Sequence, residues 1–160
     1  MTPFHVALAV FGVLVAALLV RASRRRGKNL LDTYPMLPGE ATVLEDDIEL
    51  SSRLRRRAHF TTPVFLAARV RVTNLRVLVA QPALFAPTQR VLRYVIDRGR
   101  GAPSDWLDGY LLFGLDPSKS GVRAGVLELV PTDDAPFLPE AVLLRGPSVP
   151  AVVAALGLVS

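Results

Sequence analysis

The chain has 160 residues, no cysteine and a formal net charge of +5, from 19 basic and 14 acidic residues. The lack of cysteine excludes a disulfide framework, thiolate catalysis and cysteine-based metal sites. The charge excess comes from five basic residues near the N-terminus, Arg21, Arg24, Arg25, Arg26 and Lys28. From Asp32 onward, 14 basic residues balance 14 acidic ones. A nucleic-acid partner is therefore not expected, although the pI is near 10.4.

Residues 4–20 form a run of 17 residues without charge, directly before the basic cluster. A helix over this run is about 26 Å long, close to the ~30 Å hydrocarbon core of a bilayer. We predict a transmembrane anchor over residues 1–22 and a basic juxtamembrane linker over residues 23–37. Because positive charge beside a span stays in the cytoplasm, we expect a single-pass protein of the inner (plasma) membrane. Its N-terminus would lie outside and its C-terminal domain in the cytoplasm.

Two other interpretations of the apolar run fit less well. A cleaved signal peptide carries its positive charge before the apolar stretch, whereas residues 1–5 contain no Lys or Arg. A buried helix of a soluble core would need other long apolar helices to pack against, and the sequence predicts none.

The rest of the chain alternates between short strand patterns and turns rich in Pro, Gly, Asn and Asp. Strands are predicted over residues 41–50, 52–60, 65–72, 76–80, 91–96, 107–115, 122–130 and 141–145. Alternation is clearest in 65–72, where Ala68, Val70 and Val72 share one face and Arg69 and Arg71 the other. Without a strand–helix–strand rhythm, this order predicts a small antiparallel barrel or sandwich of about seven strands.

Three details of the later elements are also predicted. In 91–96, Leu92, Tyr94 and Ile96 should share one face of the strand, opposite Arg93 and Val95. Residues 107–115 should pair with 122–130 as a hairpin and carry aromatic core residues, Trp106, Tyr110 and Phe113. A final helix should start at Ser148 as N-cap and stop at Gly157, with Val152, Val153 and Leu156 packed on the sheet.

Pro38-Gly39-Glu40 comes before the first predicted strand, and a strand ending in Thr73-Asn74-Leu75-Arg76 leads into the apolar strand Val77-Leu78-Val79. These two short motifs resemble those of the bacterial pleckstrin-homology-like and GRAM-like domains, in which the first motif opens the domain. The closing strand and helix, residues 141–158, also fit. The resemblance implies a domain over residues 38–160, with the C-terminal helix capping one end of a β-barrel.

Familiar catalytic and metal-binding arrangements are not visible. The chain has only two histidines, His5 and His59, and His59 follows an arginine run that suits a surface position. One cytoplasmic histidine without cysteine cannot supply a zinc or iron site. We therefore predict neither an enzyme nor a bound cofactor.

Arginines provide the one candidate binding surface. Arg53, Arg55 and Arg57 should share one strand face, and Arg69 and Arg71 a face of the next strand. If these strands pair, the two sets could lie side by side and bind a phosphate of a lipid headgroup. The alternative, which we favour, is that the acidic run across from them neutralises the patch: Glu45, Asp46, Asp47 and Glu49.

The sequence thus predicts a membrane-tethered, non-catalytic interaction module at the cytoplasmic face of the membrane. Residues 4–20 would contact the lipid bilayer, and the domain would bind a membrane-associated protein partner. The alternative function, which the resemblance suggests, is binding of anionic-lipid headgroups through the arginine patch.

Overall fold

A computed structural model describes residues 29–54, 63–84, 86–99, 103–107 and 109–158, together with Val13. The predicted membrane span, except Val13, and the basic residues at 21–28 lie outside this part of the chain. Among the described residues, no helix is long and apolar enough to cross a membrane.

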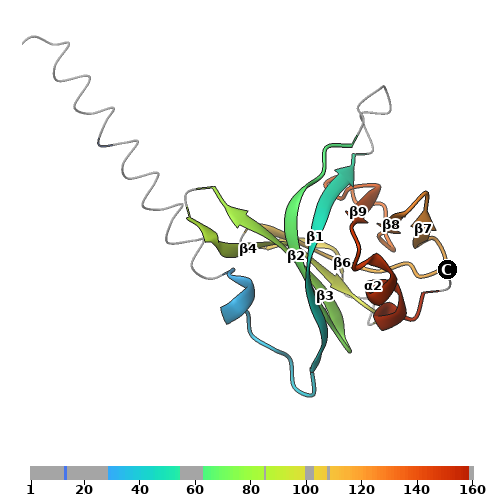
Figure 1. Cartoon of the computed structure of the whole chain (residues 1–160), viewed down its shortest axis with the longest axis horizontal. Coiled ribbons are helices and arrows are strands. Elements are labelled where there is room, and N and C mark those ends of the chain that lie inside the picture. The colour runs from blue at the N-terminus through green and yellow to red at the C-terminus, as the bar shows by residue number, and fades with distance from the viewer. Residues whose placement is uncertain are drawn as a thin grey trace, which may run out of the picture.

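The described chain forms one strongly curled sheet with a single α-helix against it (Figure 1). The order of strands across the sheet is β5-β6-β4-β3-β2-β1-β9-β8-β7. The elements are η1 (Leu31–Thr33), β1 (Thr42–Arg53), β2 (Leu66–Thr73), β3 (Arg76–Ala83), β4 (Ala86–Asp97), β5 (Asp105–Leu107), β6 (Tyr110–Gly114), β7 (Gly121–Arg123), β8 (Val126–Leu129), β9 (Ala141–Arg145) and α2 (Val149–Leu156).

The predicted class is confirmed in its main lines, since the fold is mainly β and ends in one helix. The predicted strands 41–50, 65–72, 76–80, 91–96, 107–115 and 141–145 correspond to β1, β2, β3, β4, β6 and β9. The described part of the chain contains nine strands, because β5 is an additional strand and the predicted strand 122–130 divides into β7 and β8. The pairing of β6 with β4 is parallel, so the sheet is not purely antiparallel.

The predicted hairpin between residues 107–115 and 122–130 is wrong. β6 pairs with β4 and β5, whereas β8 pairs with β7 and β9. An isolated bridge between Leu115 and Pro131 connects the ends of these two segments. Strands that follow one another in the sequence usually pair. Here β6 pairs instead with the free edge of the long strand β4, which is already buried.

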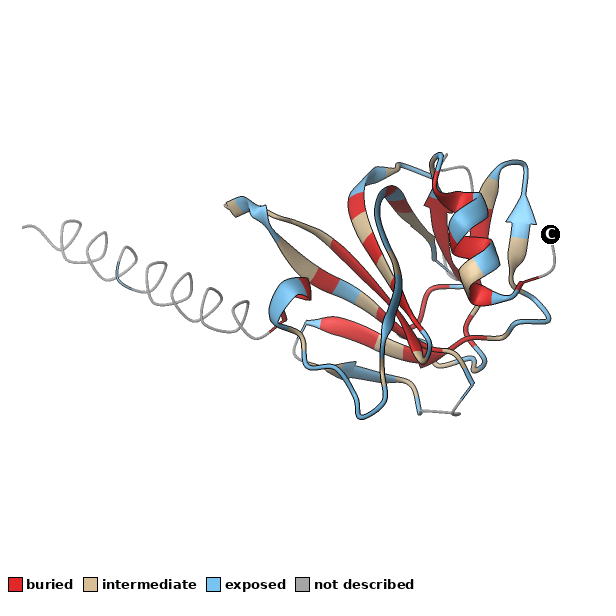
Figure 2. Ribbon diagram, turned by 60° about the horizontal axis from the view of Figure 1, so that its bottom comes forward, coloured by how far each residue is buried: buried red, intermediate tan, exposed pale blue. Residues whose placement is uncertain are grey.

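The main core lies inside the curl of the sheet and under α2 (Figure 2). As the alternation predicts, Ala68, Val70 and Val72 are buried there, and Arg69 and Arg71 lie on the other face. Phe113 of β6 is fully buried in the same cluster. Its truncation to alanine would cost about 3–5 kcal/mol, the range for large buried aromatic side chains.

A second, smaller apolar cluster lies between the sheet and the segment that precedes β1. Leu31 is fully buried there against β3 and β4, and Tyr34 packs at its edge. Tyr110 also belongs to this cluster, so the prediction of an aromatic core residue holds for it. Trp106 does not follow that prediction, because it sits on the short outermost strand β5 and is 60% exposed.

The terminal helix is confirmed, with one change at its start. Ser148 is the N-cap residue, but its hydroxyl makes no capping bond and donates instead to Asp46 Oδ2 on β1, at 2.6 Å. Gly157 ends the helix with φ of 65°, and its N–H donates to the carbonyl of Ala154. The three predicted packing residues, Val152, Val153 and Leu156, are buried.

We expect Gly157→Ala to lower the free energy of unfolding by about 1 kcal/mol, because an alanine Cβ is disfavoured at this positive φ. Gly121→Ala is the matched control: its φ is not positive and an added Cβ would meet no atom within 4 Å. Urea unfolding of both variants checks this. Equal transition midpoints for the two variants would contradict it.

Candidate functional site

Among the described residues of the predicted arginine patch, the structure separates Arg53 from Arg69 and Arg71. Arg55 and Arg57 lie outside the described residues. β2 pairs with residues 42–50 of β1, whereas the prediction assumed that it pairs with a strand over residues 52–60. Arg69 faces Asp47, however, and Arg53 lies six residues further along β1, about 20 Å away at ~3.3 Å per residue. Arg53 therefore does not lie beside Arg69 and Arg71.

The acidic run of β1 lies across from the arginines of β2, as the favoured alternative expected. Glu45 pairs with Arg71 and Asp47 with Arg69 in the register of the two strands. Arg69 donates two hydrogen bonds to Asp47, with Nε–Oδ1 at 3.0 Å and Nη2–Oδ2 at 3.2 Å. The hydrogen bond from Arg69 lowers the pKa of the Asp47 carboxyl. Arg71 Nε contacts Glu45 Oε2 at 2.6 Å, so both cations are neutralised.

The other residues of this set have separate partners. Arg53 Nη2 contacts Glu128 Oε1 at 2.8 Å, and its Nη1 lies 3.9 Å from Glu140. The hydrogen bond to Glu128 raises the pKa of Arg53. Glu49 pairs with Arg145 of β9, whereas Asp46 binds Ser148. The described members of the predicted patch therefore form short ion pairs along the outer face of the sheet.

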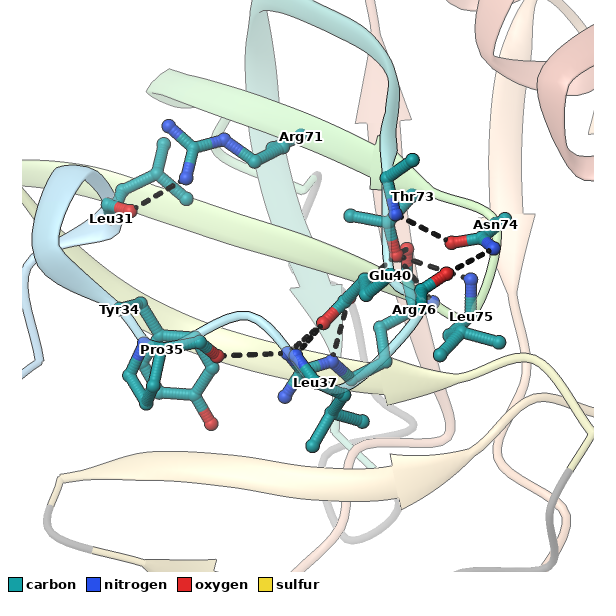
Figure 3. A network of polar contacts seen from close by, with 12 residues as sticks. Leu31, Tyr34, Pro35, Leu37, Glu40, Arg71, Thr73, Asn74, Leu75 and Arg76 are labelled. Atoms are coloured by element: carbon teal, nitrogen blue, oxygen red, sulfur yellow. Dashed lines mark hydrogen bonds and ion pairs between the residues drawn. The ribbon is translucent and has the colours of Figure 1, made fainter.

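The two motifs that carry the family resemblance meet in space around the Glu40 carboxylate (Figure 3). The Glu40 side chain is fully buried and forms a two-point ion pair with Arg76, whose Nε lies 2.9 Å from Oε1. Thr73 Oγ1 donates to the same oxygen at 2.7 Å, and the Leu37 amide donates to Oε2 at 2.7 Å. Burial alone would raise the pKa of Glu40, but these donors and the charge of Arg76 outweigh it and lower the pKa to about 2.

Asn74 completes this network through its side chain. Its Oδ1 accepts from the Ala41 amide at 2.9 Å, and its Nδ2 donates to the Gly39 carbonyl at 3.0 Å. The φ of Asn74 is not positive. The residue therefore ties the Pro38-Gly39 turn to the β2–β3 turn by hydrogen bonds.

Residues 29–37, which were predicted as the end of a linker, pack on the sheet. The Leu92 amide donates to the Asn29 carbonyl at 2.8 Å, and Arg71 Nη1 donates to the Leu31 carbonyl at 2.8 Å. The Tyr34 hydroxyl lies 3.0 Å from that of Tyr110. We call residues 29–40 the strap, because they hold the start of the described domain against β2, β3 and β4.

A pocket of about 430 Å³ is lined by residues of β1, β2, β3, β4 and β9. We call it the mouth pocket. Its wall contains Arg53, Gln81 and Arg93, and three exposed apolar side chains, Leu54, Val64 and Leu66. A smaller hollow of about 190 Å³ at the β3–β4 hairpin adjoins it, since Gln81 and Arg93 line both. A volume near 400 Å³ is within the usual range of ligand pockets, ~300–1,000 Å³.

A β-bulge in β4 directs Arg93 into this pocket. Tyr94 pairs with Val79 but Leu92 pairs with the next residue, Ala80, so Arg93 has no partner across the ladder. The predicted single face for Leu92, Tyr94 and Ile96 is therefore wrong. Leu92 packs in the second cluster, whereas Tyr94 and Ile96 belong to the main one. A bulge adds one residue to a strand, so the side chains beyond it point to the opposite face from the one that simple alternation predicts. The sequence does not show this shift.

The mouth pocket was missed from the sequence. Arg93 was read as an ordinary outward residue of an alternating strand. The signal that was available is the position of three apolar residues, because Leu54 lies within the arginine run 53–57 and Val64 and Leu66 follow it before β2 or at its start.

No protein-family model matches this chain, and neither does any curated protein. Among solved structures, the chain is similar to the crystal structure of the pleckstrin homology domain of ArhGAP27. The two sequences are 14% identical, the match covers 73% of this chain and 98% of that one, and the TM-score is 0.39.

Proposed function

We propose that this protein is a membrane-tethered, non-catalytic binding module, built on a pleckstrin-homology-like or GRAM-like domain, that binds a membrane-associated protein. Residues 4–20 and the basic residues after them support the tether and a cytoplasmic position of the domain. The tether would raise the effective concentration of the domain for partners in the same membrane.

The single observation that favours a protein over a lipid surface is the pairing of the arginines. Each described arginine of the predicted patch has a carboxylate partner within hydrogen-bond distance. An anionic headgroup would have to displace Asp47 from Arg69 and Glu45 from Arg71. The mouth pocket, in contrast, has an apolar rim, and exposed apolar residues around a pocket are typical of protein-binding sites.

The arginine pairing is tested with anionic vesicles and residues 29–160. We expect no measurable binding by the wild type, and salt-sensitive binding by the double variant E45Q/D47N. That variant removes the Glu45 and Asp47 charges from Arg69 and Arg71, and each cation near an anionic surface contributes about 1 kcal/mol. Wild-type binding that R69S/R71S abolishes would contradict the proposal and favour the lipid-binding function.

The tether is tested by extraction of the full-length protein from membranes. We expect it to stay in the membrane fraction through high-salt and carbonate washes and to need detergent, because the apolar run is long enough to span. A chain that starts at residue 29 should be released without detergent. Release of the full-length chain by carbonate alone would contradict the proposed anchor.

A further inference from the structure

Arg93 is the one Arg or Lys within the described ranges that makes neither a hydrogen bond nor an ion pair with another described residue. The others are held by carboxylates or by backbone carbonyls, as Arg90 is by Pro87 and Arg98 by Thr73. A guanidinium carries five donors and is always charged, so an unpaired one in a pocket wall offers a site for an anion. Its place in the bulge directs it toward the mouth pocket and the adjoining hollow.

The rim of the mouth pocket is apolar next to this cation. Leu54, Val64 and Leu66 are 54%, 73% and 56% exposed. At the adjoining hollow Leu84 is 80% exposed. Removal of such side chains from water favours a complex. The surface is thus suited to a ligand that combines a large apolar group with a negative charge.

The charges around the pocket favour one carboxylate over a phosphorylated headgroup. Arg53 also lines the mouth pocket, but Glu128 and Glu140 already hold it. Among the described residues that line the pocket, Arg93 is the one guanidinium without a carboxylate partner, so a ligand with several negative charges would find one such cation there. A single carboxylate needs one bidentate arginine, which Arg93 supplies.

We propose that the mouth pocket binds a protein segment in which an acidic side chain lies next to a large apolar one. Arg93 pairs with the carboxylate, and the apolar side chain packs on Leu54, Val64 and Leu66. This inference rests on the proposed function and adds to it the site and the chemistry of the partner segment.

The test uses the full-length chain in neutral detergent micelles and a displayed library of random dodecapeptides. We expect selection to enrich peptides with Asp or Glu within a few positions of Leu, Ile, Phe or Trp. Arg93→Gln should weaken the binding of the best peptide about tenfold or more, which is the loss expected for a hydrogen bond to a charged group. Arg93→Lys should restore part of the affinity, and Val64→Ser should also weaken binding.

Lys119→Gln is the control, since it removes the same charge from an exposed turn outside the pocket and should leave the affinity unchanged. If the enriched peptides bind the Arg93→Gln variant as tightly as the wild type, the assignment of the pocket is overturned. The proposed protein-binding function would still stand. A wild-type chain that selects no peptide yet binds anionic vesicles would overturn the proposed function itself. Selection of peptides without acidic residues would overturn the role of Arg93.

Discussion

Glu40→Ala is expected to lower the free energy of unfolding by about 3–5 kcal/mol, because it leaves a buried arginine without its counter-charge. Arg76 is only 9% exposed in its side chain, and Thr73 also loses its carboxylate acceptor. Since small domains are stable by about 5–15 kcal/mol, the loss would remove a large share of the total. Chemical denaturation of residues 29–160 measures it.

Glu49→Ala is the matched control, because Glu49 also pairs with an arginine but in an exposed position. The side chains of Glu49 and Arg145 are 48% and 52% exposed. Exposed pairs contribute ~0–1 kcal/mol, so the control should unfold close to wild type. Equal losses for the two variants would contradict a stabilising role for the buried pair.

The same carboxylate predicts how stability depends on pH. The folded pKa of Glu40 is about 2, below the ordinary value of 4.5. Its stabilisation is therefore complete above the unfolded pKa and is lost as the pH falls from about 5 toward 2. The shift corresponds to about 3 kcal/mol at 1.36 kcal/mol per pKa unit. Glu40→Gln should abolish that part of the acid destabilisation, and unchanged acid sensitivity in this variant would contradict the assignment.

Deletion of the strap should have a still larger effect. We expect residues 29–160 to fold and residues 41–160 to fail to give a cooperative unfolding transition. The shorter chain loses Leu31, which is fully buried, and Glu40, and it exposes the second apolar cluster. The burial of Leu31 alone stabilises by about 2–3 kcal/mol, and the loss of the ion pair adds to this.

Circular dichroism and thermal unfolding of the two chains check this prediction. A chain over residues 41–160 that unfolds cooperatively within a few degrees of the longer one would show that the strap is dispensable. In that case the domain would begin at β1.

Local patterns were enough to predict most of the fold. Alternation located β2 and its buried face, and the Ser148 and Gly157 positions located α2. The exposure of Trp106 and the absence of a hairpin over residues 107–130 could not be predicted. Both depend on β6, which pairs in parallel with β4 and not with the next strand along the chain. That choice depends on which edge of the assembled sheet is free, a tertiary property.

The candidate site was predictable only in part. The equal count of basic and acidic residues after position 31 was enough to favour neutralisation of the patch by the acidic run, but the individual pairs, Glu45 with Arg71 and Asp47 with Arg69, are set by the strand register. The position of Arg53 depends on the register of β1 against β9 as well as β2. The direction of the Arg93 side chain depends on the bulge in β4. The bulge results from the way β3 and β4 pair, and no residue pattern in the sequence indicates it.

The central claim is that the domain presents the mouth pocket to a protein at the membrane. It is tested most directly by a photoreactive phenylalanine analogue at Val64 in the full-length chain, in membranes of the cell that makes it. The same probe at Val122 on β7, 39% exposed, is the control. We predict a discrete adduct with one membrane-associated protein from position 64 and none from position 122. Transfer of the label to lipid, or equal adducts from both positions, would contradict the account.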